Sequence, residues 1–431
     1  MQNMEANQTQ DTTKKTWAWW LGMALYRVGI NAFFAGGGLS RLRRKYSGLD
    51  ERTGQLEGTP EGRLWVHAVS VGEVQSAAPL FRLARGDGIP CVLSTVTPTG
   101  REMAEQLIGP VADRIFYNPW DRPCYVRRAL DALNPRGYIA METERWPNLL
   151  AELRERRIPA FLANGRLSLR SMKKLRPQAA FWREVLSCFT RILVRFEEDA
   201  EHFRALGVED KRLVVTGDCK VGALIARKKE GDPERFAGLR RKDAPLFVAG
   251  STHQGEETVV LEAFRSVLQT KPDARLIVVP RHPERAPVVA VESSPLETEL
   301  YSRLPSSANW DVLVVDRIGV LFDLYAAADA AFVGGSLIPH GGQNMMEPAL
   351  FGVQTTHGPH TFNFPDTARM DSLGAALLVQ NADELGDAWR DVGNAKTRTS
   401  YKKACQAYFD SLGGAPERTW EVIRKFLSVA P

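Results

Sequence analysis

Short apolar segments alternate with longer helical stretches along this chain, and this alternation constrains its fold more than any other feature. Strand and helix in alternation predict an α/β protein in which parallel sheets are covered by helices. The candidate strands are four to six residues long and lie at Leu64–Val69, Cys91–Thr95, Arg114–Tyr117, Gly137–Met141, Ala160–Ala163, Arg191–Val194, Leu213–Thr216, Leu246–Ala249, Leu276–Pro280, Val312–Asp316, Ala331–Gly334, Val353–Thr356 and Ala376–Val379.

A polar, charged stretch over 226–243 interrupts the alternation and divides it into two parts. We therefore predict two doubly wound, Rossmann-like domains facing a cleft, the first over 46–225 and the second over 226–431. The last helical stretch, 416–427, is a candidate to pack back on the first domain. Ligands of such sheets bind at the carboxyl ends of the strands, so polar residues that follow strands are the candidate site residues.

The N-terminus has a different character from the rest of the chain. Residues 1–15 are polar and predict a disordered lead-in. Residues 16–45 join an apolar, Trp-rich run to a basic patch, which favours a membrane-associated segment with the body on the cytoplasmic side. Arg27 weakens a spanning helix, so a helix lying in the headgroup plane and a soluble helix packed on the body stay open.

The formal charge of the chain, +5, is concentrated at the N-terminus. Residues 1–52 hold eight Lys/Arg and four Asp/Glu, which is +4 of that total. Anionic lipids of the inner membrane would attract such a segment. The remaining chain is nearly balanced, which argues against nucleic-acid binding. Five widely spaced cysteines without CxxC spacing predict reduced thiols rather than a disulfide framework.

Two candidate clusters follow strands of the first domain. Ser70, Gly72 and Glu73 begin a helix, where Glu73 is either a general base or a charge that complements the helix dipole. Glu142 and Glu144 follow another strand, where a structural role and a metal-binding role are both open. No cluster with metal-ligand spacing accompanies them, so we predict no metal site.

Three candidate clusters follow strands of the second domain, and each carries groups that suit an anionic ligand. A Ser-Thr pair can cradle an oxyanion or cap a helix. An Arg between prolines can bind a phosphate or carboxylate through two hydrogen bonds, and two glycine pairs allow close backbone approach before an Asn and a Glu. These candidate residues are Ser251, Thr252, Arg281, His282, Gly335, Ser336, Asn344 and Glu347.

The chain resembles the 3-deoxy-D-manno-octulosonic acid (Kdo) transferase family of lipopolysaccharide synthesis. The matching motifs occur in order from about residue 20 to the end: Trp65–Glu73, Glu142–Asn148, Asn164–Ser168, Ser251–Glu257, Pro280–Arg285, Gly334–Ser336 and Gly358–His360. The resemblance implies a GT-B fold and transfer of Kdo from CMP-Kdo to the 6′-hydroxyl of a lipid A precursor, lipid IVA, without a metal or cofactor. It also implies a location at the cytoplasmic face of the inner membrane.

The resemblance implies roles for individual residues. Glu73 becomes the general base, Arg281, His282 and Glu347 surround CMP, and Ser251 and Lys220 lie near the donor phosphate or carboxylate. Glu142 or Glu144 supports the cleft, and Arg101 is a candidate for the acceptor phosphates. Attack by a hydroxyl at the anomeric carbon with CMP as leaving group predicts inversion.

Three positions depart from the family pattern. Gln343 stands where the family has His, Val320 where it has Glu, and Asp218 where it has Asn. All three fall in predicted donor loops and leave Glu73 untouched. Two other functions therefore stay open: another GT-B enzyme of nucleotide sugars, and a non-catalytic relative that only binds the donor.

Overall fold

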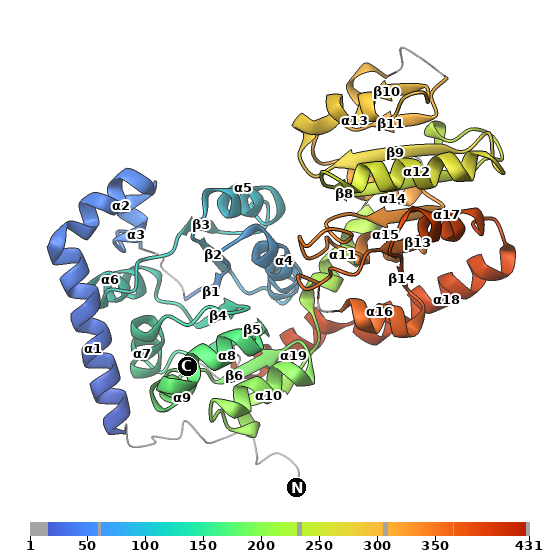
Figure 1. Cartoon of the computed structure of the whole chain (residues 1–431). Coiled ribbons are helices and arrows are strands. Elements are labelled where there is room, and N and C mark those ends of the chain that lie inside the picture. The colour runs from blue at the N-terminus through green and yellow to red at the C-terminus, as the bar shows by residue number, and fades with distance from the viewer. Residues whose placement is uncertain (1–15, 59–61, 231–234, 305–308, 365, 428–431) are drawn as a thin grey trace, which may run out of the picture. The chain divides into compact units, whose positions relative to one another are not determined.

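The computed structural model describes residues 16–58, 62–230, 235–304, 309–364 and 366–427, and the lead-in predicted for 1–15 lies outside them. The chain folds into two compact units (Figure 1). Unit 1 comprises residues 1–223 and 413–431, and unit 2 comprises residues 224–412. The break falls between Ala223 and Leu224, two residues before the predicted boundary. Each unit is built on its own parallel sheet.

The sheet of unit 1 has seven strands in the order β3-β2-β1-β4-β5-β6-β7. All of its pairings are parallel, as alternating strands and helices require. The strands are β1 Leu64–His67, β2 Cys91–Thr95, β3 Arg114–Tyr117, β4 Gly137–Met141, β5 Ala160–Gly165, β6 Arg191–Val194 and β7 Leu213–Val215.

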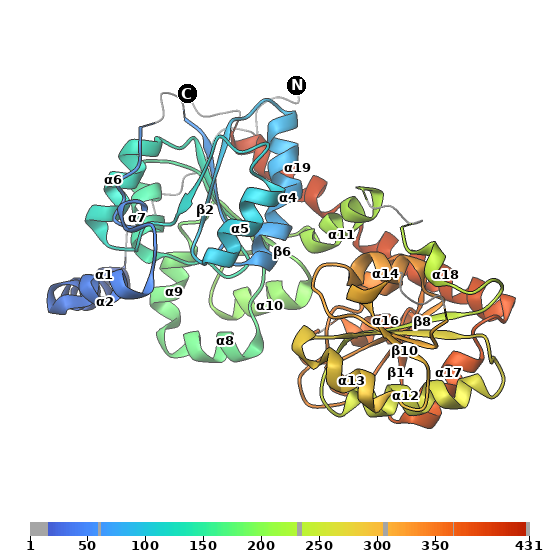
Figure 2. The ribbon, with the colours of Figure 1, turned by 90° about the horizontal axis from the view of Figure 1, so that it is seen from above.

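Helices cover both faces of this sheet (Figure 2). One apolar cluster lies under α4 Val71–Gly86, α5 Pro98–Leu107 and α19 Ala415–Leu427. The other lies under α1 Trp17–Phe33, α6 Pro123–Leu133, α7 Pro147–Glu155, α9 Ala179–Leu186 and α10 Glu197–Ala205. The remaining helices of unit 1 are η1 Phe34–Gly38, α2 Leu39–Lys45, α3 Leu49–Arg52, α8 Leu169–Leu175, η2 Arg176–Gln178, η3 Asp210–Arg212 and the start of α11 Cys219–Glu230.

Unit 2 repeats this architecture with the strand order β10-β11-β9-β8-β12-β13-β14, again parallel throughout. Its strands are β8 Leu246–Thr252, β9 Arg275–Pro280, β10 Thr298–Leu300, β11 Val312–Val314, β12 Ala330–Val333, β13 Gln354–His357 and β14 Leu377–Leu378. Its helices are η4 Ala237–Leu239, α12 Glu256–Leu268, η5 Pro283–Arg285, α13 Ala286–Glu292, η6 Tyr301–Arg303, α14 Leu321–Ala327, α15 Met346–Leu350, α16 Thr367–Leu373, α17 Ala382–Arg390 and α18 Ala395–Leu412. The predicted α/β class with two Rossmann-like units is therefore confirmed.

Helix α1 has polar contacts on its inward face and an apolar outward face. Its inward residues Trp19 and Met23 are buried in unit 1, while Tyr26 donates a hydrogen bond to Asp121 at 2.9 Å and Arg27 donates one to Asn148 at 2.8 Å. Its outward stripe is exposed and apolar, comprising Trp17, Trp20, Leu21, Leu25 and Val28. No helix in the described part of the chain is long and apolar enough to cross a membrane.

Candidate functional site

Glu73 lies in the first turn of α4, directly after β1, at the carboxyl edge of the unit 1 sheet. The turn points its carboxylate back toward the strand end, where the backbone N–H of Val69 donates to Oε2 at 2.9 Å. The hydroxyl of Ser70 lies 3.4 Å from Oε1. Glu73 is thus a buried, oriented carboxylate rather than a solvated charge at a helix start.

The surroundings of Glu73 raise its pKa to about 7. Burial is the main cause, and the negative charges of Glu144 and Glu142 add to it, while the Val69 N–H and Lys220 act in the opposite direction. A carboxylate whose pKa lies near the working pH is suited to accept a proton from a hydroxyl group. Glu73 therefore has the properties that general-base catalysis needs.

Glu142 holds two cations beside Glu73. Glu142 follows β4 directly and has a left-handed backbone conformation (φ 53°). One carboxylate oxygen lies 2.7 Å from Nζ of Lys220 and the other 2.9 Å from Nε of Arg166. The structure thus places Lys220 in unit 1, beside Gly72, whereas the other predicted donor residues lie in unit 2.

Glu144 faces a buried polar network instead. Its Oε2 lies 3.6 Å from Nε2 of His67, and the indole of Trp146 donates to the same nitrogen at 3.3 Å. The other ring nitrogen of His67 lies 2.8 Å from the hydroxyl of Ser94. Glu142 and Glu144 therefore contact other protein groups, in agreement with a structural role.

Arg101, the predicted contact for acceptor phosphates, is already engaged by acidic residues. Its guanidinium lies 2.8 Å from Glu51 and 3.0 Å from Glu105, and it stacks over the Tyr117 ring at 4.8 Å. Two carboxylates neutralise its charge, so Arg101 has little capacity left for a phosphate.

The carboxyl edge of unit 2 is organised around Glu256, which the sequence placed near the site without giving it a role. The fully buried carboxylate of Glu256 accepts backbone N–H groups from two loops. The donors lie at 2.7–3.0 Å and are His253, Gly335, Ser336 and Leu337. The backbone donors of Gly335 and Ser336 are thus committed to Glu256 rather than free for a phosphate.

Two glycines allow these loops to pack against each other. A Cβ at Gly334 would collide with the backbone of Ser251, and a Cβ at Gly358 would collide with the backbone of Ser336. Ser251 itself has a left-handed backbone (φ 54°), while Thr252 is buried at the end of β8. The predicted residues of this edge are therefore brought together, with Ser251 next to the glycine loop.

Cationic and imidazole groups gather at the same edge. The ring of His253 lies 4.5 Å from that of His340 and 5.9 Å from that of His282. Burial, followed by the positive surroundings of His340, His282, Arg281 and Arg285, lowers the pKa of His253 to about 4. Arg281 and His282 are exposed here and can meet an anion. Arg285 pairs with Glu257 at 3.4 Å, so Arg281, His282 and the exposed His340 are the groups of this edge that suit an anionic ligand.

Asn344 and Glu347 form one hydrogen-bonded unit. The Asn344 amide donates to the Glu347 carboxylate at 3.2 Å and its oxygen accepts the Met346 N–H at 3.1 Å. Burial raises the pKa of Glu347, while Arg227 acts to lower it. Of the residues that depart from the family pattern, Gln343 lies beside Gly335, whereas Val320 is part of the apolar core.

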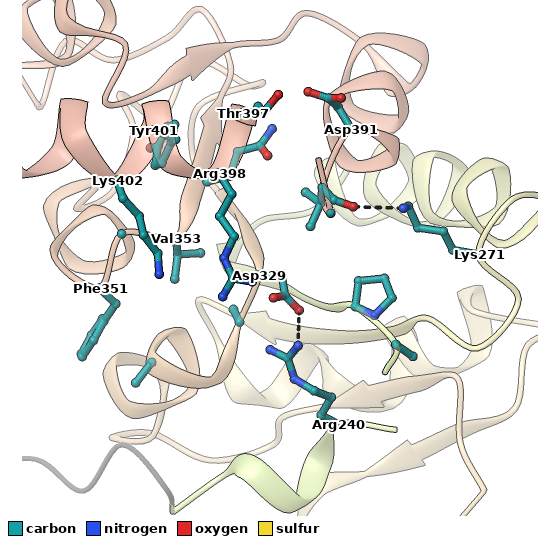
Figure 3. A pocket seen from close by; sticks show the side chains of 18 of the residues that line it. Arg240, Lys271, Asp329, Phe351, Val353, Asp391, Thr397, Arg398, Tyr401 and Lys402 are labelled. Atoms are coloured by element: carbon teal, nitrogen blue, oxygen red, sulfur yellow. Dashed lines mark hydrogen bonds and ion pairs between the residues drawn. The ribbon is translucent and has the colours of Figure 1, made fainter. Parts of the chain in front are cut away.

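A groove of about 420 Å³ opens at the opposite, amino edge of the unit 2 sheet (Figure 3). Arg240 pairs there with Asp329 at 2.7 Å, and Lys271 donates to the carbonyl of Val392 at 2.9 Å. None of the predicted site residues lines this groove, so it is distinct from the candidate site.

Two units of this kind, each built on a parallel sheet covered by helices, define a protein of the GT-B type of fold. Residues 47–223 match the family described as 3-deoxy-D-manno-octulosonic-acid transferase (Kdo transferase). The Kdo transferase of Haemophilus influenzae is 34% identical over 381 residues, which are 85% of this chain and 88% of that protein. The Bordetella pertussis enzyme is 32% identical over 378 residues, which cover 84% and 87% of the two chains.

The chain therefore belongs to the Kdo transferase family, which are glycosyltransferases of lipopolysaccharide synthesis. The family predicted from the sequence motifs is confirmed. Among solved structures, a UDP-GlcNAc 2-epimerase from Neisseria meningitidis covers 85% of this chain with a TM-score of 0.60. At 12% identity this likeness concerns the fold alone.

Proposed function

We propose that this protein transfers Kdo from CMP-Kdo to a hydroxyl group of a lipid A precursor, with inversion at the anomeric carbon. The observation that carries this proposal is the environment of Glu73, a buried carboxylate with a pKa of about 7 at a strand end. The family membership supports Kdo as the sugar. The cationic edge of unit 2 supports a donor that carries a phosphate and a sugar carboxylate.

The reaction needs one proton transfer from the acceptor. Glu73 takes the proton of the acceptor hydroxyl as its oxygen forms a bond to the anomeric carbon of Kdo. The bond from that carbon to the CMP phosphate oxygen breaks with its electron pair, so CMP leaves as an anion. Attack opposite the leaving group passes through an oxocarbenium-like state and inverts the anomeric centre.

We further propose that the enzyme acts at the cytoplasmic face of the inner membrane. The apolar outward stripe of α1 supports a helix that lies in the headgroup plane. The adjoining helix α2 exposes a cluster of basic residues that anionic lipids attract, comprising Arg41, Arg43, Arg44 and Lys45.

The test incubates purified protein with CMP-Kdo and a tetraacyl lipid A precursor, and reads product masses and the anomeric configuration of the new linkage. We expect the mass of the acceptor plus Kdo, inverted geometry, and loss of transfer in Glu73→Ala. The proposal is wrong if wild type transfers nothing or if Glu73→Ala keeps the wild-type rate. Tight binding of UDP without binding of CMP would instead indicate a different nucleotide-sugar enzyme.

A further inference from the structure

One segment of unit 1 carries positive charge that the proposed reaction has not used. The 28 residues from 156 to 183 contain eight Lys/Arg and no Asp/Glu. Within this segment a shallow groove of about 450 Å³ lies along α8, which we call the α8 groove. It is lined by Leu169, Arg170, Lys173 and Lys174.

The cations of the α8 groove lack partners. Across the described part of the chain, the side chains of Arg170, Lys173 and Lys174 form no hydrogen bond or ion pair. Arg101 and Arg166, by contrast, each contact a carboxylate within 3.0 Å. The spacing along the helix puts the three free cations on neighbouring positions of one surface. Leu169 lies among them with half of its surface exposed.

The α8 groove is held in a fixed relation to Glu73. Helix α8 begins just after β5, whose carboxyl end lies at the same edge of the parallel sheet as the end of β1. Arg166 pairs with Glu142, and Glu142 pairs with Lys220 beside Gly72, so ion pairs connect the start of α8 to the turn that carries Glu73. The motif Asn164–Ser168 forms this connection.

The backbone of that motif is fixed from both sides. Asn164, with a left-handed backbone (φ 53°), accepts the Cys219 N–H at 2.9 Å through its side chain. Asp199 accepts the Leu167 N–H at 3.0 Å, and Ser168 caps α8 by accepting the Ser171 N–H at 3.2 Å. Such a support places the α8 groove on a preformed surface.

Helix α9 links the segment of the α8 groove to the amphipathic helix α1. Helix α9, which follows α8 in the chain, packs against α1 (Figure 1), and the Phe181 ring leaves no room for a Cβ at Gly22. The exposed apolar stripe of α1 and the unpaired cations of α8 thus belong to neighbouring parts of unit 1. The unpaired cations of the α8 groove lie beside the half-exposed Leu169, and this combination suits a molecule that is both anionic and acylated.

We propose that the α8 groove binds a phosphate group of the acylated, phosphorylated acceptor, with Leu169 against its apolar part. The inference rests on the proposed function. It names a phosphate subsite for the acceptor in place of Arg101, whose guanidinium already pairs with Glu51 and Glu105. Arg170, Lys173 and Lys174 hold the phosphate, while the ion pairs through Arg166 and Glu142 set its position relative to Glu73.

The test compares wild type with Lys173→Ala/Lys174→Ala, using the acceptor in neutral detergent so that no charged bilayer is present. We expect the acceptor KM to rise on the order of tenfold or more, with kcat and the KM for CMP-Kdo unchanged. The matched control, Lys396→Ala/Lys403→Ala, removes two exposed lysines from α18 of unit 2 and should change neither constant. Lys173→Arg/Lys174→Arg should restore the low acceptor KM.

A second arm uses an acceptor with one phosphate removed. Wild type should bind it more weakly than the intact acceptor, and Lys173→Ala/Lys174→Ala should no longer distinguish the two. An unchanged acceptor KM, or a variant that loses only binding to anionic vesicles, overturns the proposal and assigns the α8 groove to membrane headgroups. If wild type shows no transfer, equilibrium binding of the two acceptors to both proteins decides the subsite separately from the reaction.

Discussion

Glu73 shows how one residue can acquire a function from its position. A glutamate at a helix start is ordinarily a solvated charge that complements the helix dipole. Here the end of β1 and the first turn of α4 bury it, and two neighbouring carboxylates make its ionisation harder. The same burial that raises the pKa of Glu73 to about 7 also imposes a cost on the folded protein when the carboxyl group is ionised.

The rate of transfer should depend on the ionisation of Glu73. Only the carboxylate form accepts a proton, so kcat should fall about tenfold per pH unit below its pKa of about 7. The measurement is kcat with saturating CMP-Kdo and acceptor from pH 5 to 9. Glu142→Gln removes a negative neighbour and should move the profile to lower pH, whereas a flat wild-type profile would contradict the assignment.

The contribution of Glu73 to the stability of unit 1 should change with pH in the opposite direction to the rate. The folded pKa of Glu73 lies above its ordinary value of 4.5, so its stabilising contribution is full below pH 4.5 and is lost as pH rises through about 7. At pH 8 the free energy of unfolding of Glu73→Gln, measured with urea, should therefore exceed that of wild type by up to about 3 kcal/mol. The difference between the two proteins should shrink toward pH 5. A gap that widens toward low pH would refute this linkage.

Glu256 should support donor binding without touching the donor. Its carboxylate holds four backbone N–H groups, three of them in the Gly335–Leu337 loop. Glu256→Gln keeps the size of the side chain but removes its negative charge. Hydrogen bonds to charged groups contribute about 1.5–3 kcal/mol each, so the loop should be held less firmly. We expect CMP to bind at least tenfold more weakly by calorimetry, with acceptor binding unchanged; Glu262→Gln, on the same helix, is the control.

At the scale of single residues, the sequence predicted where site residues lie in the fold better than it predicted which residues they contact. The position of Glu73 after a strand and at a helix start could be predicted, because strand, small residue and helix start are local features. The ion pairs of Glu142 were not, because Arg166 and Lys220 lie 24 and 78 positions further along the chain and meet it only when β4 and β5 pair and α11 begins. The partners of Glu256 in the glycine loop, about 80 residues away, are hidden for the same reason.

Among the elements, α1 stands out because its two faces serve different purposes. Buried Trp19 and Met23 and the hydrogen bonds of Tyr26 and Arg27 fix it to unit 1. Asp121 receives the Tyr26 hydroxyl and two backbone N–H groups, and burial raises the pKa of Asp121 to about 7 despite them. The outward face is exposed and apolar, and the proposed function assigns it to a lipid surface.

Substitutions on the two faces of α1 should therefore separate attachment from membrane binding. Tyr26→Phe removes a hydrogen bond to a buried carboxylate, at a cost of about 1–3 kcal/mol, and should speed amide hydrogen exchange over 17–33. Trp20→Ala, on the outward face, should leave that exchange unchanged and weaken sedimentation with anionic vesicles. Equal effects of both variants on exchange would show that the two faces do not act separately.

The strands illustrate which elements local pattern can predict. Apolar runs such as Cys91–Thr95 and Arg191–Val194 coincide with β2 and β6, because a strand buried on both faces needs a continuous apolar sequence. Strand β10, Thr298–Leu300, was missed. It is short, polar and only half-buried at the sheet edge, so its pairing with β11 rather than its sequence defines it.

At the scale of the whole molecule, the chain crosses between its two units twice. It leaves unit 1 within α11, and after α18 it returns, so that α19 belongs to unit 1 although it ends the described chain. Alternation of strands and helices predicted two domains, because that pattern is local. The sequence also made the last helical stretch, 416–427, a candidate to pack on the first domain, and α19 belongs to unit 1.

Helix α19 should be needed for the stability of unit 1 and not for that of unit 2. Trp420, Ile423 and Leu427 are buried against the unit 1 sheet, and the Trp420 indole donates to Asp87 at 2.8 Å. Trp420→Ala deletes a large buried side chain, so we expect a loss of about 3–5 kcal/mol. Hydrogen exchange read by mass spectrometry should show the loss in strands β1–β7 alone.

The matched variant, Trp389→Ala, tests the core of unit 2. Trp389 is fully buried in unit 2 and stacks on Phe247 with ring centroids 4.8 Å apart. Trp389→Ala removes the same side chain and should raise exchange in strands β8–β14 while leaving β1–β7 protected. If either variant raised exchange in both sheets equally, the units would unfold as one cooperative body, and the energetic independence that two separate cores imply would be wrong.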